Sequence, residues 1–323
     1  MPPVQVSLNP LSVLSSHLLA LFFGFSYVGS LYAVKNARLR FSETRSDAHH
    51  GVQPGSRDDP AVIRARLTAV TFATLFNCGV IYALVARSTP PSFDRAFSST
   101  LTILGVRWPD SILSSLQTPL LFLGPLYGSY LAGTLPGQSR YSLDHNFEMF
   151  WSWVGFRNYT WGPLTEEIVF RACVLAVYAL GGAARWKMIA FAPLVFGLAH
   201  VHHAWDTYNR YGRTKDALRR AMLSTLFQTA YTTLFGAHTS YLFLRTGSLL
   251  PPLAAHVFCN IMGVPQIQNE MRRFPERKQI IIGVYVLGIV LFAYTLGPWT
   301  DAPASLYWRA PEGFWRGAVG QPA

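Results

Sequence analysis

Long apolar blocks separated by short polar connections are the dominant pattern of this chain. A transmembrane helix needs about 20 consecutive, mostly apolar residues, and a window scan for such stretches predicts eight spans. They lie near residues 11–34, 67–86, 115–134, 162–180, 186–201, 222–244, 248–264 and 279–297. We therefore predict an all-α integral membrane protein with about eight transmembrane helices, in which residues 1–323 form a single membrane domain.

Three segments need separate interpretation. Residues 42–60 are polar and rich in Pro and Gly, which predicts a loop or linker. Residues 97–113 alternate apolar and small polar side chains, a pattern typical of a helix lying at the membrane interface. The first apolar block is longer than a signal-peptide core and lacks a small-residue cleavage site, so we expect it to be retained as the first span.

Composition supports a membrane protein and argues against other classes. Half of the residues are apolar and only 13% are charged, about half the charged share of an ordinary soluble domain. The net charge is +11, but no basic run is interleaved with aromatic residues on a soluble fold, so no nucleic-acid partner is predicted. Cys78, Cys173 and Cys259 all lie in apolar stretches, which predicts buried free thiols rather than a disulfide framework.

The distribution of Lys and Arg predicts the orientation. The connections after spans 1, 3, 5 and 7 hold 18 of the 27 basic residues, and the opposite side holds 8. The positive-inside rule therefore places those four connections in the cytosol. Glu166 then starts a span that enters from the cytosol, His200 ends a span that returns to it, and His256 and Asn260 lie in the cytosolic part of span 7. We expect these side chains to meet in a cavity that faces the cytosol.

Span 4 carries the most unusual charges, because Glu166, Glu167 and Arg171 enter an otherwise apolar helix. Glu167 and Arg171 are four residues apart and share a helix face, which predicts a buried ion pair. Glu166 points about 100° away from Glu167 and has no local partner. Ionisable residues inside a membrane are functional by default, although a structural ion pair near the interface is the alternative.

Span 5 ends at Phe196 and His200, and His202 and His203 follow at the membrane boundary. The histidine spacing differs from the i, i+4 ligand pair of an HExxH zinc site, and that motif occurs nowhere in the chain, so no metal is predicted. We interpret His202 and His203 as interfacial residues and His200 as a candidate for chemistry.

Span 7 places His256 and Asn260 four residues apart, hence on one helix face. Two hydrogen-bond donors directed into one cavity can stabilise an oxyanion, whereas the alternative is a polar pair that holds helices together. Cys173 lies too deep in the apolar region to be a good thiolate nucleophile.

Three motifs in this order on separate spans resemble the CAAX protease and bacteriocin-processing family of intramembrane proteases. They are Glu-Glu-x-x-x-Arg at Glu166, Glu167 and Arg171, Phe-x-x-x-His at Phe196 and His200, and His-x-x-x-Asn at His256 and Asn260. Residues 233–237, 244–247 and 256–263 look like the eukaryotic, type II CAAX prenyl protease branch. The resemblance covers residues 155–270, the expected catalytic core.

The resemblance implies an endoplasmic reticulum enzyme that removes the last three residues of farnesylated or geranylgeranylated CAAX proteins, such as Ras-like GTPases and prenylated pheromone precursors. It implies an eight-helix bundle in contact with membrane lipids, with a conical cavity open to the cytosol and no cofactor. By the family pattern Glu166 and His200 activate a water, and His256 and Asn260 stabilise the oxyanion. Glu167, Arg171 and Phe196 support the site.

Two other hypotheses remain open from the residues alone. Glu166, His200 and His256 could instead ligate zinc in a metalloprotease. The polar cluster could also belong to a non-catalytic membrane scaffold, or to an escort that binds the lipid tail of a partner.

Overall fold

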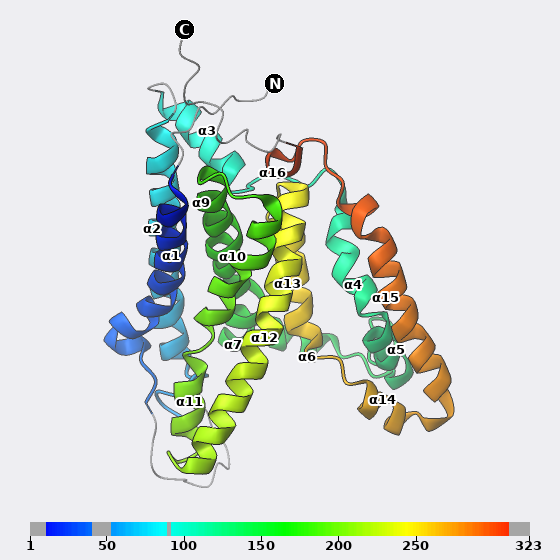
Figure 1. Ribbon diagram of the computed structural model, residues 1–323. Coiled ribbons are helices and arrows are strands. Elements are labelled where there is room, and N and C mark those ends of the chain that lie inside the picture. Colours follow the sequence, from blue (N-terminus) through cyan, green and yellow to red (C-terminus); the bar gives the residue numbers. More distant parts are fainter. Residues whose placement is uncertain (1–10, 41–52, 89–91, 310–323) are drawn as a thin grey trace.

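A computed structural model describes residues 11–40, 53–88 and 92–309, and every regular element in these ranges is a helix (Figure 1). The all-α prediction is therefore confirmed for the described part of the chain. Most of the linker predicted at 42–60 lies outside the described residues, and positions 53–59 form turns without a helix.

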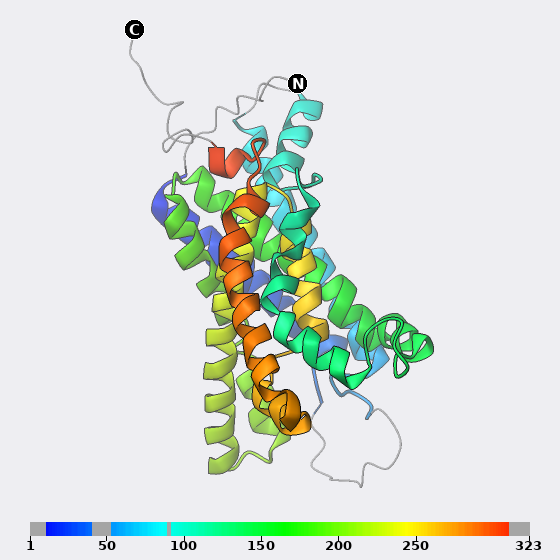
Figure 2. The same cartoon turned by 90° about the vertical axis from the view of Figure 1, so that its right-hand side faces the viewer.

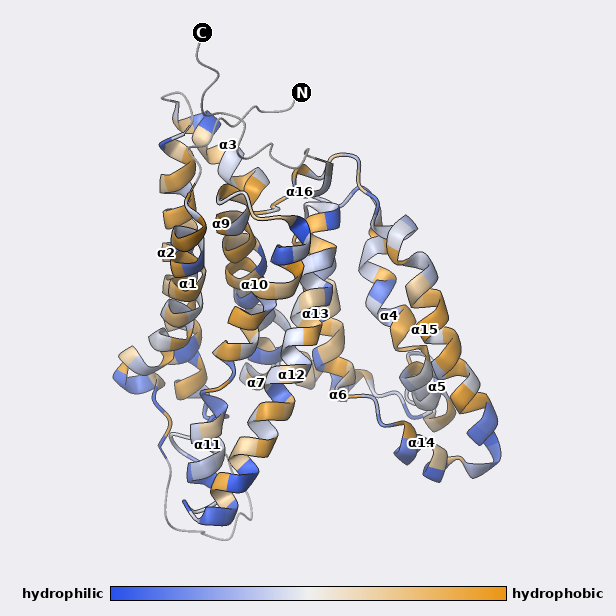
Figure 3. Ribbon diagram, in the orientation of Figure 1, coloured by the Kyte–Doolittle hydropathy of each residue, from blue (hydrophilic) through white to orange (hydrophobic). Residues whose placement is uncertain are grey.

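Four stretches are long and apolar enough to cross a membrane. They are Val13–Ala33 (α1), Pro60–Ala86 (α2), Arg185–Arg210 and Pro275–Thr300. Large apolar side chains point outward from three of them, as at Phe25, Phe72 and Ile289, each more than half exposed. Figure 3 shows the resulting apolar bands, with hydrophilic residues gathered toward the ends of the helices. Such an extensive apolar surface is suited to contact with lipid.

The remaining predicted spans depart from single ideal helices. Residues 115–134 are split among η2 (Ile112–Leu116), α4 (Gln117–Leu121) and α5 (Leu123–Ala132), with an interruption at Phe122. Pro119 and Pro125 flank this break, and each lacks the N–H that would continue the helical hydrogen bonding. Span 7 corresponds to α13 (Leu250–Met262), which has only 13 residues. Length and composition alone therefore support four spans in the described chain, fewer than the eight predicted.

Residues 153–180 form one continuous helix that changes its hydrogen-bonding pattern along its length. Its parts are α7 (Trp153–Gly155), η3 (Phe156–Trp161), α8 (Gly162–Glu167), η4 (Ile168–Cys173) and α9 (Val174–Leu180). The segments η3 and η4 are π-helical. Short π-helical segments occur frequently at functional sites. The two adjacent glutamates at the end of α8 lie between these two segments.

The central part of the bundle surrounds α9, whose seven residues are at most 6% exposed. It packs against α1 and α10 (Arg185–Ala199), and the neighbouring η4 also contacts α12 (Lys215–Thr246). The short helices α11 (His203–Arg210) and α14 (Ile267–Arg273) lie at one end of the bundle, and α3 (Phe93–Ile103) and α16 (Leu306–Arg309) lie at the other (Figure 1). The interfacial helix predicted at 97–113 thus corresponds to α3, which starts earlier and stops at Ile103.

A second group of helices, α4, α5, α14 and α15 (Lys278–Thr300), stands beside α12 and α13, as Figures 1 and 2 show from two directions. Glycine allows close packing within this group. A Cβ atom at Gly288 of α15 would lie 2.9 Å from the carbonyl oxygen of Leu120. One buried hydrogen bond, from Gln117 Nε2 to Thr295 Oγ1 at 3.1 Å, also links α4 with α15. Small residues at such contacts let helix backbones approach closely inside a membrane.

We predict that Gly288→Leu destabilises the protein by about 1–3 kcal/mol, because the added side chain must push α15 away from the α4 backbone. Gly283→Leu on the same helix is the matched control, since nothing lies within 4 Å of a Cβ atom there. Thermal unfolding in detergent measures both variants. Equal melting temperatures for the two would contradict this account of the packing.

Candidate active site

A cavity of about 480 Å³ opens between α1, α2, α8, α10, α12 and α13. This volume lies within the usual range of small-molecule sites. Its lining contains all four residues that the sequence predicted to carry chemistry: Glu166, His200, His256 and Asn260. Helices that are far apart in the sequence thus bring the four candidate residues together on two facing walls of a single cavity.

The predicted ion pair between Glu167 and Arg171 is present behind this wall. Arg171 Nε lies 3.1 Å from Glu167 Oε2, and both side chains are at most 1% exposed. The same Nε donates a hydrogen bond to Thr239 Oγ1 at 2.9 Å, and the guanidinium stacks on the Phe196 ring with its central carbon 4.1 Å from the ring centroid. A planar guanidinium suits this combination of carboxylate and aromatic partners.

Glu167 has a second partner that sequence reasoning missed. Its Oε1 lies 2.6 Å from His256 Nδ1, so one carboxylate bridges Arg171 and His256. The two residues are 89 positions apart, which no helical spacing could reveal. This contact directs the other ring nitrogen, Nε2, toward Glu166, whose Oε2 is 3.7 Å away. The only feature of the sequence that pointed to a further partner was the second glutamate, because one arginine can neutralise only one of two adjacent carboxylates.

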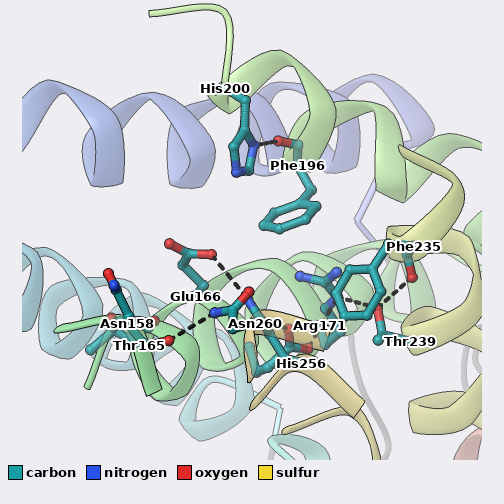
Figure 4. A network of polar contacts seen from close by, with 12 residues as sticks. Asn158, Thr165, Glu166, Arg171, Phe196, His200, Phe235, Thr239, His256 and Asn260 are labelled. Atoms are coloured by element: carbon teal, nitrogen blue, oxygen red, sulfur yellow. Dashed lines mark hydrogen bonds and ion pairs between the residues drawn. The ribbon is translucent and has the colours of Figure 1, made fainter. Parts of the chain in front are cut away.

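His200 is held by a different kind of partner. Its Nδ1 lies 2.8 Å from the carbonyl oxygen of Phe196, one turn earlier in α10. Because a carbonyl oxygen only accepts, Nδ1 carries the hydrogen, and in the neutral ring Nε2 is left as an acceptor. The ring packs edge-on against Phe196 at 4.7 Å and faces Glu166 across the cavity (Figure 4). Phe196 therefore contacts both His200 and Arg171.

Asn260 lies one turn after His256 on the same face of α13. Its Nδ2 donates a hydrogen bond of 2.8 Å to the carbonyl oxygen of Asn158 in η3. A carboxamide nitrogen has two hydrogens, so this bond fixes the orientation of the group and leaves one N–H for another acceptor. The π-helical segment η3 thus orients a candidate catalytic side chain on a neighbouring helix.

His202 and His203 line the cavity as well, which the interpretation as plain interfacial residues did not anticipate. His203 Nδ1 lies 3.8 Å from Asp206 Oδ2, and the two imidazole centroids are 4.1 Å apart. Within the described ranges, no three His, Cys, Asp or Glu side chains are grouped so that they could hold one metal ion. The proposed zinc ligands Glu166, His200 and His256 are therefore not arranged as such a set.

The three cysteines are free thiols, as predicted. Cys173 is fully buried, and its Sγ lies 4.0 Å from Cys78 Sγ. It is not among the residues that line the cavity, whereas Cys259 is. The position of Cys173 thus agrees with the sequence argument against a thiol nucleophile at this residue.

Comparison with known proteins gives consistent matches. A family model described as type II CAAX prenyl endopeptidase Rce1-like matches residues 148–262. The chain is 31% identical to the probable CAAX prenyl protease 2 of Schizosaccharomyces pombe, over 87% of this chain and 92% of the relative. It is 34% identical to CAAX prenyl protease 2 of Homo sapiens, over 85% of this chain and 78% of the relative. No solved structure matches the chain.

We predict that Glu167→Ala destabilises the protein by about 3–5 kcal/mol, because it leaves the buried Arg171 without its carboxylate. Glu166→Ala is the matched control: it removes the same group from the neighbouring residue but leaves that pair intact. Thermal unfolding and the yield of detergent-extracted protein measure both variants. Similar losses of stability in the two variants would show that Glu167 has no special structural role.

Proposed function

Because the chain belongs to the Rce1-like type II CAAX prenyl endopeptidase family, we propose that it removes the C-terminal tripeptide from prenylated CAAX proteins. The substrates are farnesylated or geranylgeranylated proteins, such as Ras-like GTPases and prenylated pheromone precursors. The observation that carries this proposal is the convergence of Glu166, His200, His256 and Asn260 on one cavity. The names of the relatives support the same reaction.

The first step of the proposed mechanism is activation of water by Glu166. The carboxylate takes a proton from the water, whose oxygen attacks the carbonyl carbon of the prenylated cysteine. The free Nε2 of His200, on the opposite side of the cavity, accepts the second hydrogen bond of that water and orients it. This division of roles makes the enzyme an intramembrane protease of the glutamate type.

The second step is stabilisation and collapse of the tetrahedral oxyanion. The free N–H of Asn260 donates to it, and so does Nε2 of His256 when both nitrogens of that ring carry hydrogen. The carboxylate of Glu167, whose Oε1 lies 2.6 Å from Nδ1, balances the charge of this form of His256. The peptide C–N bond then breaks, and Glu166 returns its proton to the departing amine.

The proposed location is the endoplasmic reticulum membrane, with about eight helices crossing it and the cavity open to the cytosol. The excess of basic residues in the connections after predicted spans 1, 3, 5 and 7 supports this orientation. The helices α11 and α14, which belong to two of those connections, lie at the same end of the bundle. A prenylated protein made in the cytosol is anchored in the cytosolic leaflet, so its cysteine arrives on that side.

The experiment that tests the function is release of the tripeptide from a farnesylated peptide by purified protein. We expect release by the wild type, and a decrease of about 10²–10⁴-fold in Glu166→Gln, which keeps the size of the side chain but removes the base. Activity should persist after chelation with phenanthroline and in Cys173→Ser. Loss on chelation with recovery in zinc would indicate a metalloprotease. A wild type that binds the peptide without cleaving it would indicate an escort.

We predict that Asn260→Ala lowers kcat by about 10²–10³-fold with little change in KM, because one oxyanion donor is lost. Asn260→Asp should be worse, since it places a carboxylate where negative charge develops. Steady-state kinetics on the farnesylated peptide measures both variants. A raised KM with unchanged kcat would instead assign Asn260 to substrate binding.

A further inference from the structure

Arg66 of α2 is an unusual part of the cavity lining, because its guanidinium is buried and one of its donor nitrogens has no hydrogen-bond partner. The side chain is about nine-tenths buried, and its Nε donates to the carbonyl oxygen of Ala37 at 2.8 Å. Its Nη2 is buried without a hydrogen-bond partner among the described residues. No ion pair within 4 Å involves Arg66 among the described residues, although the buried carboxylate of Asp206 lies near enough for the two charges to interact. A buried guanidinium with unused donors favours an anion from outside.

Arg57 and Arg157 line the same part of the cavity, and hydrogen bonds hold the Arg157 side chain in place. Arg157 donates through Nη2 to Asp58 Oδ1 at 3.1 Å and through Nη1 to the carbonyl oxygen of Arg57 at 2.7 Å. The side chain of Asp59 accepts from the backbone N–H of Gly55 and Ala61, which lowers the pKa of the Asp59 carboxyl. These bonds fix the turn that presents Arg57 beside Arg66.

The distance of Arg66 from the proposed scissile bond follows from how α2 packs against the continuous helix of residues 153–180. Trp161 Nε1 donates to Thr71 Oγ1 at 2.7 Å, so these two residues lie at the same level. Both helices run from the α11 end of the bundle toward the α3 end (Figure 1). Arg66 precedes Thr71 by five residues, and Glu166 follows Trp161 by five. At about 1.5 Å per residue, Arg66 begins about 15 Å from Glu166 along the bundle.

Resting on the proposed function, we propose that Arg66 binds the C-terminal carboxylate of the substrate. Three extended residues span about 10 Å between the cleaved bond and that carboxylate. The arginine side chain is long enough to span the remaining distance, from the substrate carboxylate to the Arg66 backbone. A carboxylate is a suitable acceptor for the unpartnered Nη2 of Arg66, and Arg57 adds a second positive charge nearby.

This arrangement would determine which peptide bond is cleaved. The carboxylate is anchored at one end of the tripeptide, and the water-activating Glu166 lies one tripeptide length away. The anchor recognises a group that every free C-terminus carries, independent of the side chains of the last three residues. A blocked C-terminus should therefore be a poor substrate even when the prenylated cysteine is unchanged.

The test compares two farnesylated peptides of the same sequence, one with a free C-terminal carboxylate and one with a C-terminal amide. The wild type should cleave the amide about 10- to 100-fold less efficiently in kcat/KM, mainly through KM. Arg66→Gln should lower cleavage of the acid to the level of the amide and leave the amide almost unaffected. Arg66→Lys, which keeps the charge, should restore part of the preference.

The matched control is Arg64→Gln. Arg64 is on the same helix, is exposed, and lies over the Trp153 ring outside the cavity lining, so its loss should keep the preference for the acid. The assay uses vesicles of phosphatidylcholine alone, which contain no anionic lipid that could occupy the same arginines. A preference that persists there comes from the peptide carboxylate.

Two results would overturn the proposal: equal cleavage of acid and amide by the wild type, or an equal loss on both peptides in Arg66→Gln. The second result would assign Arg66 only a structural role through Ala37. If Arg66→Gln does not fold, the comparison of acid and amide by the wild type decides alone. Failure of the wild type to cleave either prenylated peptide would refute the proposed function itself.

Discussion

The buried carboxylate of Glu167 is the interaction on which the rest of the site depends. It neutralises Arg171 and holds His256, and it has no measurable exposure to solvent. A charge in such surroundings is tolerated only when it is paired, so the three side chains form one electrostatic unit. Each belongs to a packed helix, and Thr239 of α12 completes the set through Arg171. The geometry of the candidate active site is therefore linked to the stability of the bundle.

Phe196 connects this unit to the opposite wall of the cavity. One face of its ring carries the Arg171 guanidinium, and the same ring lies nearly perpendicular to the ring of His200. Its own carbonyl oxygen holds Nδ1 of the same histidine. A single residue thus helps to position two charged or polar groups that have no direct contact with each other. This explains in physical terms why phenylalanine at a four-residue spacing from histidine fits the resemblance stated from the sequence.

The parts that depend on local spacing could be predicted from the sequence, and the parts that depend on tertiary contacts could not. The Glu167–Arg171 pair follows from a separation of four residues, and it forms even though Arg171 lies in the π-helical segment η4. The presence of membrane-spanning helices follows from the long apolar blocks of the sequence. The contact of Glu167 with His256 does not, because it is set by helices that meet in space. The interruption at Phe122 is flanked by Pro119 and Pro125, so its signal was present in the sequence although a continuous span was predicted there. The charge on Arg66 could be read from the sequence, but its missing partners could not.

Two histidines of the same cavity are held through Nδ1 by different partners, a neutral carbonyl oxygen for His200 and a carboxylate for His256. The carbonyl oxygen of Phe196 fixes hydrogen on Nδ1 of His200, so a neutral His200 presents an acceptor at Nε2. The carboxylate of Glu167 accepts from Nδ1 of His256 at 2.6 Å, and Nε2 of that ring points toward Glu166. Hydrolysis of a peptide bond needs one group that accepts from water and another that donates to the oxyanion. The roles that we propose for His200 and His256 therefore depend on the group that holds each ring.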